Sequence, residues 1–182
     1  MTTPSKALRA TLFAAALTVP GAAAAQHADH AGHGAGLPSI PGSIRAEHQE
    51  IHARLEAATK APGATGRAAR ELAAVLHPHF LREEQIALPP LGLLAPLARG
   101  EFGPEMRSVL PLTDSLRAEL PRMLTEHEAI HAATARLLEA ARAEHQAEAV
   151  GLAEALALHA TSEEEIFYPA AVLVGDLVRA HR

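Results

Sequence analysis

Histidine and glutamate recur in this sequence at spacings that place them on one face of a helix. The chain has 182 residues, and 12 of them are histidine, the commonest metal-ligating side chain. Residues four positions apart lie one above the other on a helix, and His79/Glu83 and His159/Glu163 have this spacing. Imidazole nitrogens and carboxylate oxygens gathered in this way predict a transition-metal site. The candidate ligands are His48, His79, Glu83, His127, His131, His159, Glu163 and Glu164.

These candidates belong to an internal repeat. The segment EHQEIHA at 47–53 returns as EHEAIHA at 126–132. The segment HFLREEQIALPP at 79–90 returns, at almost the same offset, as HATSEEEIFYPA at 159–170. Each copy holds a His-x-x-x-His segment and then a His-x-x-x-Glu-Glu segment that is followed by proline. The pattern predicts a helical hairpin that has been duplicated.

The two hairpins predict four helices, over about 44–60, 67–88, 121–144 and 147–168. Pro78 is expected to kink the second helix, and Pro169 to end the fourth, because proline cannot continue the hydrogen-bond ladder. Pro121 is expected in the first turn of the third helix. A further helical stretch is expected over 105–120, within the long connection. The predicted fold class is all-α, an antiparallel up-down four-helix bundle.

Apolar residues mark the face that each predicted helix buries, and a histidine interrupts that face in all four. In the fourth helix the face runs through Leu152, Leu156, His159, Glu163 and Ile166, at steps of 4, 3, 4 and 3. Burying a polar group without a partner costs about 1–3 kcal/mol, and a carboxylate costs more. Four imidazoles and two carboxylates on these faces therefore predict a metal centre that satisfies them together.

The order of these residues resembles the hemerythrin/HHE cation-binding family over about residues 44–170. The resemblance implies a four-helix bundle around a non-haem di-iron centre, with two iron ions bridged by carboxylates and an oxo or hydroxo group. One iron would be open to O₂ or to another small diatomic or peroxide ligand. The implied ligands, in chain order, are His48, then His79 and Glu83, then His127 and His131, then His159 with Glu163 or Glu164.

Two points of the ligand set stay open. Glu163 has the spacing of the HHE variants, and Glu164 has that of the oxygen carriers, in which aspartate is usual. His52 has no required counterpart in the family, so it is either an additional ligand or a supporting group.

The favoured function is that of a hemerythrin-like di-iron protein that binds or senses O₂ or a related small oxidant, or handles iron, without enzymatic turnover. One alternative is a metal-buffering module for zinc or copper, with His27, His30 and His33 as a capture arm. Another is a ferritin-like di-iron oxidase, whose sites use Glu-x-x-His on paired helices. That motif occurs at Glu128–His131, but the repeat has Gln49 in its place. A helical interaction protein would leave the buried histidines unexplained.

Composition excludes several other classes. The chain has no cysteine, which excludes disulfides, iron–sulfur clusters and a thiol nucleophile. Its net charge is −5, from 16 Lys and Arg against 21 Asp and Glu, which argues against a nucleic-acid partner. No motif indicates a particular protein partner.

The N-terminal segment 1–25 reads as a secretory signal peptide. Lys6 and Arg9 precede an uncharged, Ala-rich run over 10–25, and Ala23 and Ala25 form a small-x-small cleavage site before Gln26. The expected product is exported, to the periplasm in a Gram-negative host, and carries no membrane segment after cleavage. Residues 26–43 are expected to form a His-rich flexible leader, and 44–182 the hemerythrin-like domain.

Overall fold

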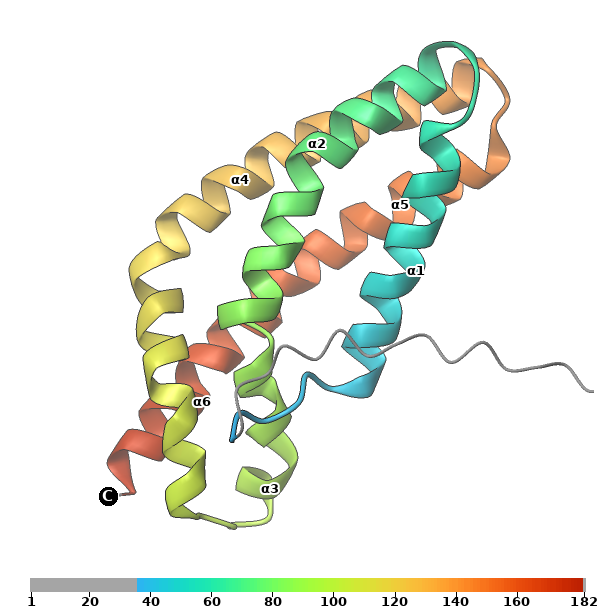
Figure 1. Ribbon diagram of the computed structural model, residues 1–182. Coiled ribbons are helices and arrows are strands. Elements are labelled where there is room, and N and C mark those ends of the chain that lie inside the picture. The colour runs from blue at the N-terminus through green and yellow to red at the C-terminus, as the bar shows by residue number, and fades with distance from the viewer. Residues whose placement is uncertain (1–35, 182) are drawn as a thin grey trace, which may run out of the picture. The chain divides into compact units, whose positions relative to one another are not determined.

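The computed structural model describes residues 36–181, and the regular elements among them are all helical (Figure 1). The expected signal peptide at 1–25 lies outside the described residues, as do His27, His30 and His33 of the leader. Ile40 is already buried, ahead of the first helix. Between residues 36 and 181, none of the helices combines the length and apolar character that a bilayer span requires.

Four helical rods make up the bundle. Short 3₁₀ helices at Pro89–Leu93 and Pro104–Val109, with α3 (Leu94–Ala98) between them, connect the second rod to the third. The rods are α1 (Gly42–Thr59), α2 (Gly63–Ile86), α4 (Leu110–Ala143), and α5 (Ala147–Ser162) continued by a π turn (Glu163–Phe167) and α6 (Tyr168–Ala180).

The rods are arranged as a ring in which successive rods run in opposite directions (Figure 1). Both α1 and α4 pack against α2 and α5. The predicted all-α four-helix bundle is therefore confirmed for the described residues. Each half of the sequence repeat supplies one antiparallel pair, α1 with α2 and α4 with α5.

The described residues form three buried apolar clusters, and a polar layer lies between two of them along each rod. On α1, Ile44 belongs to one cluster and Ile51 to the other, with buried His48 between them. On α4, Met123 and Ile130 flank His127 in the same way. Burial of a large apolar side chain contributes about 1.5–3 kcal/mol. The two clusters therefore stabilise the rods on both sides of the polar layer.

The third rod is longer than expected. Pro121 lies in the interior of α4 rather than in its first turn, and Pro111 takes the first-turn position instead. A proline in a helix interior removes one hydrogen bond. The helical stretch expected over 105–120 is thus mainly the first part of α4 itself.

The fourth rod also differs from the prediction, because Pro169 does not end it. The rod passes through the π turn and continues to Ala180, with Pro169 in the first turn of α6. The wider turn shifts the phase of the helix. Ile166, expected on the buried face, is 58% exposed, and Tyr168 is 1% exposed.

A carboxylate from the second hairpin caps the helix that closes the first. Glu144, directly after α4, accepts hydrogen bonds from the backbone N–H groups of Ala64 at 2.7 Å and Thr65 at 2.9 Å. These groups are among those that lack a partner at the start of a helix. The hydrogen bonds from Thr65 and Ala64 lower the pKa of Glu144 to about 2. The cap thereby fixes the start of α2 against the end of α4.

Candidate metal centre

Six polar side chains form the layer between the two apolar clusters, and all are at most 2% exposed. Each rod supplies one histidine, and the second and fourth rods each add a glutamate four residues later. This spacing sets both side chains on one face of the helix. The six residues, which we call the inner cluster, are His48, His79, Glu83, His127, His159 and Glu163.

The inner cluster divides into two groups that share Glu163. His48, His159 and Glu163 have ligand-type atoms within 4.8 Å of one another, as do His79, Glu83, His127 and Glu163. Glu163 Oε1 lies 2.9 Å from His159 Nε2, and its Oε2 lies 3.7 Å from His127 Nε2. One carboxylate therefore points one oxygen at each group, the disposition needed to bridge two cations.

Four further carboxylates, the outer carboxylates, lie on the opposite side of the imidazole rings. Glu126 is 2.9 Å from His79 Nδ1 and Glu164 is 2.7 Å from His127 Nδ1. Metal-ligating histidines commonly donate their second ring N–H to a carboxylate, which sets the ring orientation and the tautomer. His48 makes the same contact with Glu84 at 3.2 Å, and Glu47 lies 3.2 Å from His159 Nδ1 as an ion-pair contact rather than an aligned hydrogen bond. All four Nε2 atoms are left to face the interior.

The outer carboxylates occur at equivalent positions of the internal repeat, as the residues of the inner cluster do. Glu47 and Glu126 each precede the histidine of their own helix, but each contacts a histidine of another rod. Glu84 and Glu164 each follow an inner glutamate. The two groups are therefore related by the repeat, histidine for histidine and carboxylate for carboxylate.

Several buried atoms of the inner cluster have no hydrogen-bond partner among the described residues. They are His48 Nε2, both ring nitrogens of His159, Glu83 Oε2 and Glu163 Oε1. In addition, the Nε2 atoms of His79 and His127 face each other at 2.8 Å. With Nδ1 of both rings donating to carboxylates, either a proton or a metal ion must lie between the two Nε2 atoms, because their lone pairs would otherwise repel each other. A cation among these atoms satisfies them, so the residues fit a metal centre.

The protonation of these groups reflects their burial and their close spacing. Burial disfavours the charged form of His48, but contacts with Glu163 and Glu84 outweigh it and raise its pKa to about 9. The pKa of His79 is raised to about 9 against the same burial, chiefly by Glu83. Burial, and then the charge of Glu83, raise the pKa of Glu163 well above its usual range. Protons therefore compete with metal ions for this cluster.

Aromatic side chains complete the two groups differently. Phe80 stacks on the His48 ring with centroids 4.1 Å apart and meets His159 edge-on at 5.6 Å. Tyr168 instead reaches the other group, where its hydroxyl donates to Glu83. Burial, followed by the Glu83 charge, raises the pKa of Tyr168, so its hydroxyl is a proton donor here. One group thus has an apolar wall and the other a phenol.

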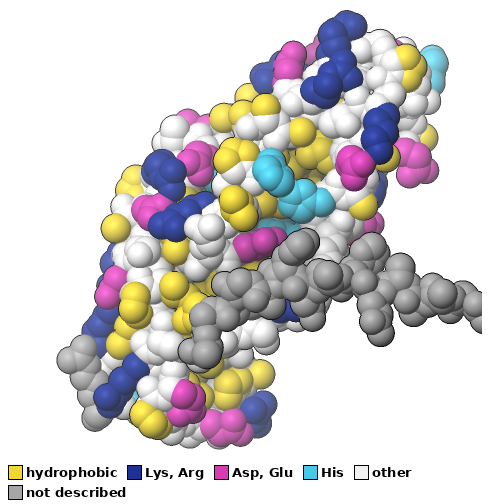
Figure 2. Space-filling model, in the orientation of Figure 1, with side chains coloured by type: hydrophobic (Ala, Val, Ile, Leu, Met, Phe, Trp, Pro, Cys, Tyr) yellow, Lys and Arg dark blue, Asp and Glu magenta, His cyan; other side chains and the backbone are white. Residues whose placement is uncertain are grey.

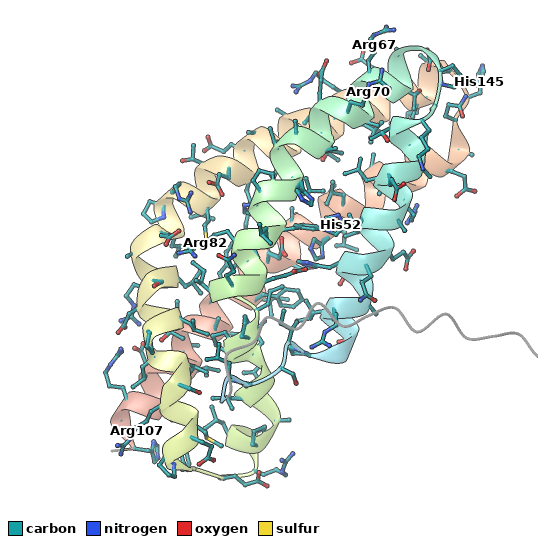
Figure 3. All side chains as sticks on the ribbon, in the orientation of Figure 1. His52, Arg67, Arg70, Arg82, Arg107 and His145 are labelled. Atoms are coloured by element: carbon teal, nitrogen blue, oxygen red, sulfur yellow. The ribbon has the colours of Figure 1, made fainter. Side chains whose placement is uncertain are left out.

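The remaining candidates from the sequence lie further out. His131 has a 39% exposed side chain, and its Nε2 is 3.3 Å from Glu164 rather than among the inner atoms. His52 is half-buried and lies between α1 and α2, where Figure 3 labels it. It forms an edge-on pair with His77, with ring centroids 5.6 Å apart. Both line a surface hollow, and Figure 2 shows histidines among apolar side chains on this face.

Comparison with known proteins agrees with this geometry. Residues 39–171 match the hemerythrin HHE cation-binding domain, a stretch that contains the whole inner cluster and all four rods up to the start of α6. The chain belongs to the hemerythrin HHE cation-binding domain family. Cation binding is the property that the family name gives, and the buried His/Glu groups could hold a metal ion. No curated protein and no solved structure matched the chain significantly.

Sequence reasoning passed over two parts of this hemerythrin-like site. It did not assign any function to Glu47 and Glu126, although the repeated Glu-His pair at 47–48 and 126–127 was a usable signal. The sequence also does not place Tyr168 at the site, because the five-residue step from Glu163 leaves the face of a regular α-helix. Only the π turn returns Tyr168 to that face.

Proposed function

We propose that the inner cluster holds two iron ions and that the protein binds or senses O₂ or a related small oxidant. His48, His159 and Glu163 would hold one ion, and His79, Glu83 and His127 the other, with Glu163 between them. The observation that carries the proposal is the shared Glu163 carboxylate, with one oxygen toward each group. Nitrogen and oxygen ligands without thiolate suit iron.

The proposal takes Glu163, rather than Glu164, as the ligand on the fourth rod. Glu163 is 1% exposed and faces the interior, whereas Glu164 contacts His127 through Nδ1, on the outer side of the ring. We therefore assign Glu163 as a ligand and Glu164 as an outer carboxylate. His131 is hydrogen-bonded to Glu164, so we place it with the outer carboxylates rather than among the ligands.

Iron in this centre would supply electrons and exchangeable ligand positions to a small molecule. The chain's contribution is to hold the imidazoles by their outer carboxylates and to exclude water. The group of His48, His159 and Glu163 has fewer protein donors than the other, and Phe80 covers His48. A small apolar molecule is favoured next to that group, because Phe80 offers it no competing hydrogen bond.

Metal analysis tests this proposal directly. The purified chain is loaded with Fe(II) in the absence of air and then exposed to air, and iron content and visible absorption are recorded. We expect two irons per chain and a new visible absorption on exposure. His79→Ala and His159→Ala should each lose stoichiometric iron, whereas His77→Ala, on an exposed residue of the same helix as His79, should retain it.

Other results would revise the function. Iron retained equally by His79→Ala, His159→Ala and the parent would place the site elsewhere. Tight zinc or copper binding, with no iron uptake and no optical change in air, would instead favour the metal-buffering module.

We further propose that the chain is exported and that segment 1–25 is removed. The support is the charge and small-residue pattern before Gln26. N-terminal sequencing of the protein from fractionated cells should begin at Gln26, in the periplasmic fraction of a Gram-negative host. Recovery of the intact N-terminus in the cytoplasm would contradict export.

A further inference from the structure

The only tyrosine of the chain is buried with its hydroxyl against three atoms of the inner cluster. Tyr168 is 1% exposed, and its oxygen lies 2.9 Å from His127 Nε2 and 3.3 Å from His79 Nε2. The hydroxyl also donates to Glu83 Oε1. A buried tyrosine in a core needs one hydrogen-bond partner. Here it meets three, and all three are proposed ligands of one metal ion.

We propose that the Tyr168 oxygen is itself a ligand of the metal ion held by His79, Glu83 and His127. This inference rests on the proposed function and adds a residue to it. Ligand atoms that sit about 2.1 Å from an octahedral ion are about 3 Å from their neighbours. The Tyr168 oxygen has this separation from both Nε2 atoms. An ion that binds both imidazoles is therefore within reach of the phenol oxygen.

The π turn is the backbone feature that brings Tyr168 to this position. The Tyr168 N–H donates to the Glu163 carbonyl, a step of five residues instead of four. In a regular α-helix, with 3.6 residues per turn, the fifth residue after Glu163 would point about 140° away from it. The π turn takes up the extra residue, so Glu163 and Tyr168 both face the inner cluster. Such turns occur frequently at functional sites.

Only one half of the internal repeat supplies an oxygen at the position of the Tyr168 hydroxyl. By the offset that relates His159 to His79, the counterpart of Tyr168 is Leu88, which is fully buried and apolar. The resemblance to hemerythrins assigned a ligand to His131, but that side chain lies on the outer side with Glu164. Tyr168 thus supplies a donor where His131 does not, and the two metal positions become chemically unequal.

Ligation by Tyr168 has a signature independent of activity. Metal binding replaces the hydroxyl proton, which leaves to solvent, and a phenolate bound to Fe(III) absorbs visible light by ligand-to-metal charge transfer. The Fe(III)-loaded full chain is examined by resonance Raman spectroscopy within the visible band. Because the chain has a single tyrosine, any enhanced tyrosine ring vibration comes from Tyr168. We expect such vibrations, and we expect them to shift when the protein is grown on ring-deuterated tyrosine.

A variant supplies the second arm of the test. Tyr168→Phe keeps the ring and should bind two irons per chain while losing the tyrosine vibrations completely. If that variant does not fold, the deuterium shift of the parent still decides the matter. Two bound irons without any tyrosine vibration would overturn ligation by Tyr168 and leave the proposed function intact. Failure of the parent to bind iron would overturn both.

Discussion

Removal of an outer carboxylate is predicted to weaken metal binding although the residue never touches the ion. Glu126 is the best case, because its carboxylate is 2.9 Å from His79 Nδ1 and only 32% exposed. It both orients the imidazole and increases its electron donation to a cation at Nε2. Loss of such a partner typically reduces metal affinity by about 10–100-fold, which is about 1.4–2.8 kcal/mol.

The structure also ranks the four outer carboxylates. Glu126 and Glu164 make the shorter contacts, at 2.9 and 2.7 Å, and are about one-third exposed, at 32% and 33%. Glu84 and Glu47 are both at 3.2 Å and are 43% and 48% exposed. Water therefore competes more strongly with the histidines for the carboxylate oxygens of Glu84 and Glu47. We expect alanine variants of the first pair near the 100-fold end and those of the second pair near the 10-fold end.

Glu126 also has an opposing effect on metal binding, through the pKa of His79. It contributes to the raised pKa of that imidazole, so its removal makes the proton easier to displace. A divalent ion carries more charge than a proton, so the carboxylate stabilises the metal-bound state more strongly. The net effect of Glu126→Ala is therefore weaker binding, and Glu126→Gln, which keeps an oxygen acceptor, should lie between that variant and the parent.

The assay is a competition titration of each variant against a chromophoric chelator, at one pH and one salt concentration. Glu128→Ala is the matched control, because Glu128 is an exposed residue of the same helix two positions later. Equal affinities for Glu126→Ala, Glu128→Ala and the parent would refute the assignment of Nδ1 to the carboxylate and Nε2 to the metal.

Three further predictions concern stability and are read from unfolding curves of the metal-free protein. Glu144→Gln should lower Tm. The folded-state pKa of Glu144 is depressed to about 2, so the difference from the parent should be full above about pH 4.5 and vanish as pH falls through 2; a constant difference would argue against the cap. Gly63→Ala should destabilise by about 1–2 kcal/mol, because Gly63 has φ +71 and a Cβ there would lie 2.2 Å from Glu144 Oε1; Gly42→Ala, with nothing within 4 Å, is its control. Leu72→Ala, at a residue with 0% exposure, should cost about 2–5 kcal/mol in a urea titration, whereas Leu158→Ala, at 69% exposure, should cost much less.

Most of the fold follows from local patterns in the sequence. The apolar steps that place His48 and His127 between apolar neighbours depend only on the helical period, and both side chains are buried as expected. The ends of the rods were harder to predict. Proline is compatible with the first turn of a helix and can be accommodated inside one, so Pro121 does not determine where a helix begins and Pro169 does not determine where one ends.

The sequence by itself determined that four helices would meet through a layer of histidine and glutamate, because residue type and period are local properties. It also determined the duplication, and with it the correspondence between the two groups. Tertiary structure alone decided which atoms face inward. Glu163 and Glu164 are adjacent in sequence, yet the packing of the fourth rod against its neighbours turns one into the interior and the other toward His127 Nδ1. The π turn that presents Tyr168 arises from the same packing, because no local signal distinguishes a turn of five residues from one of four.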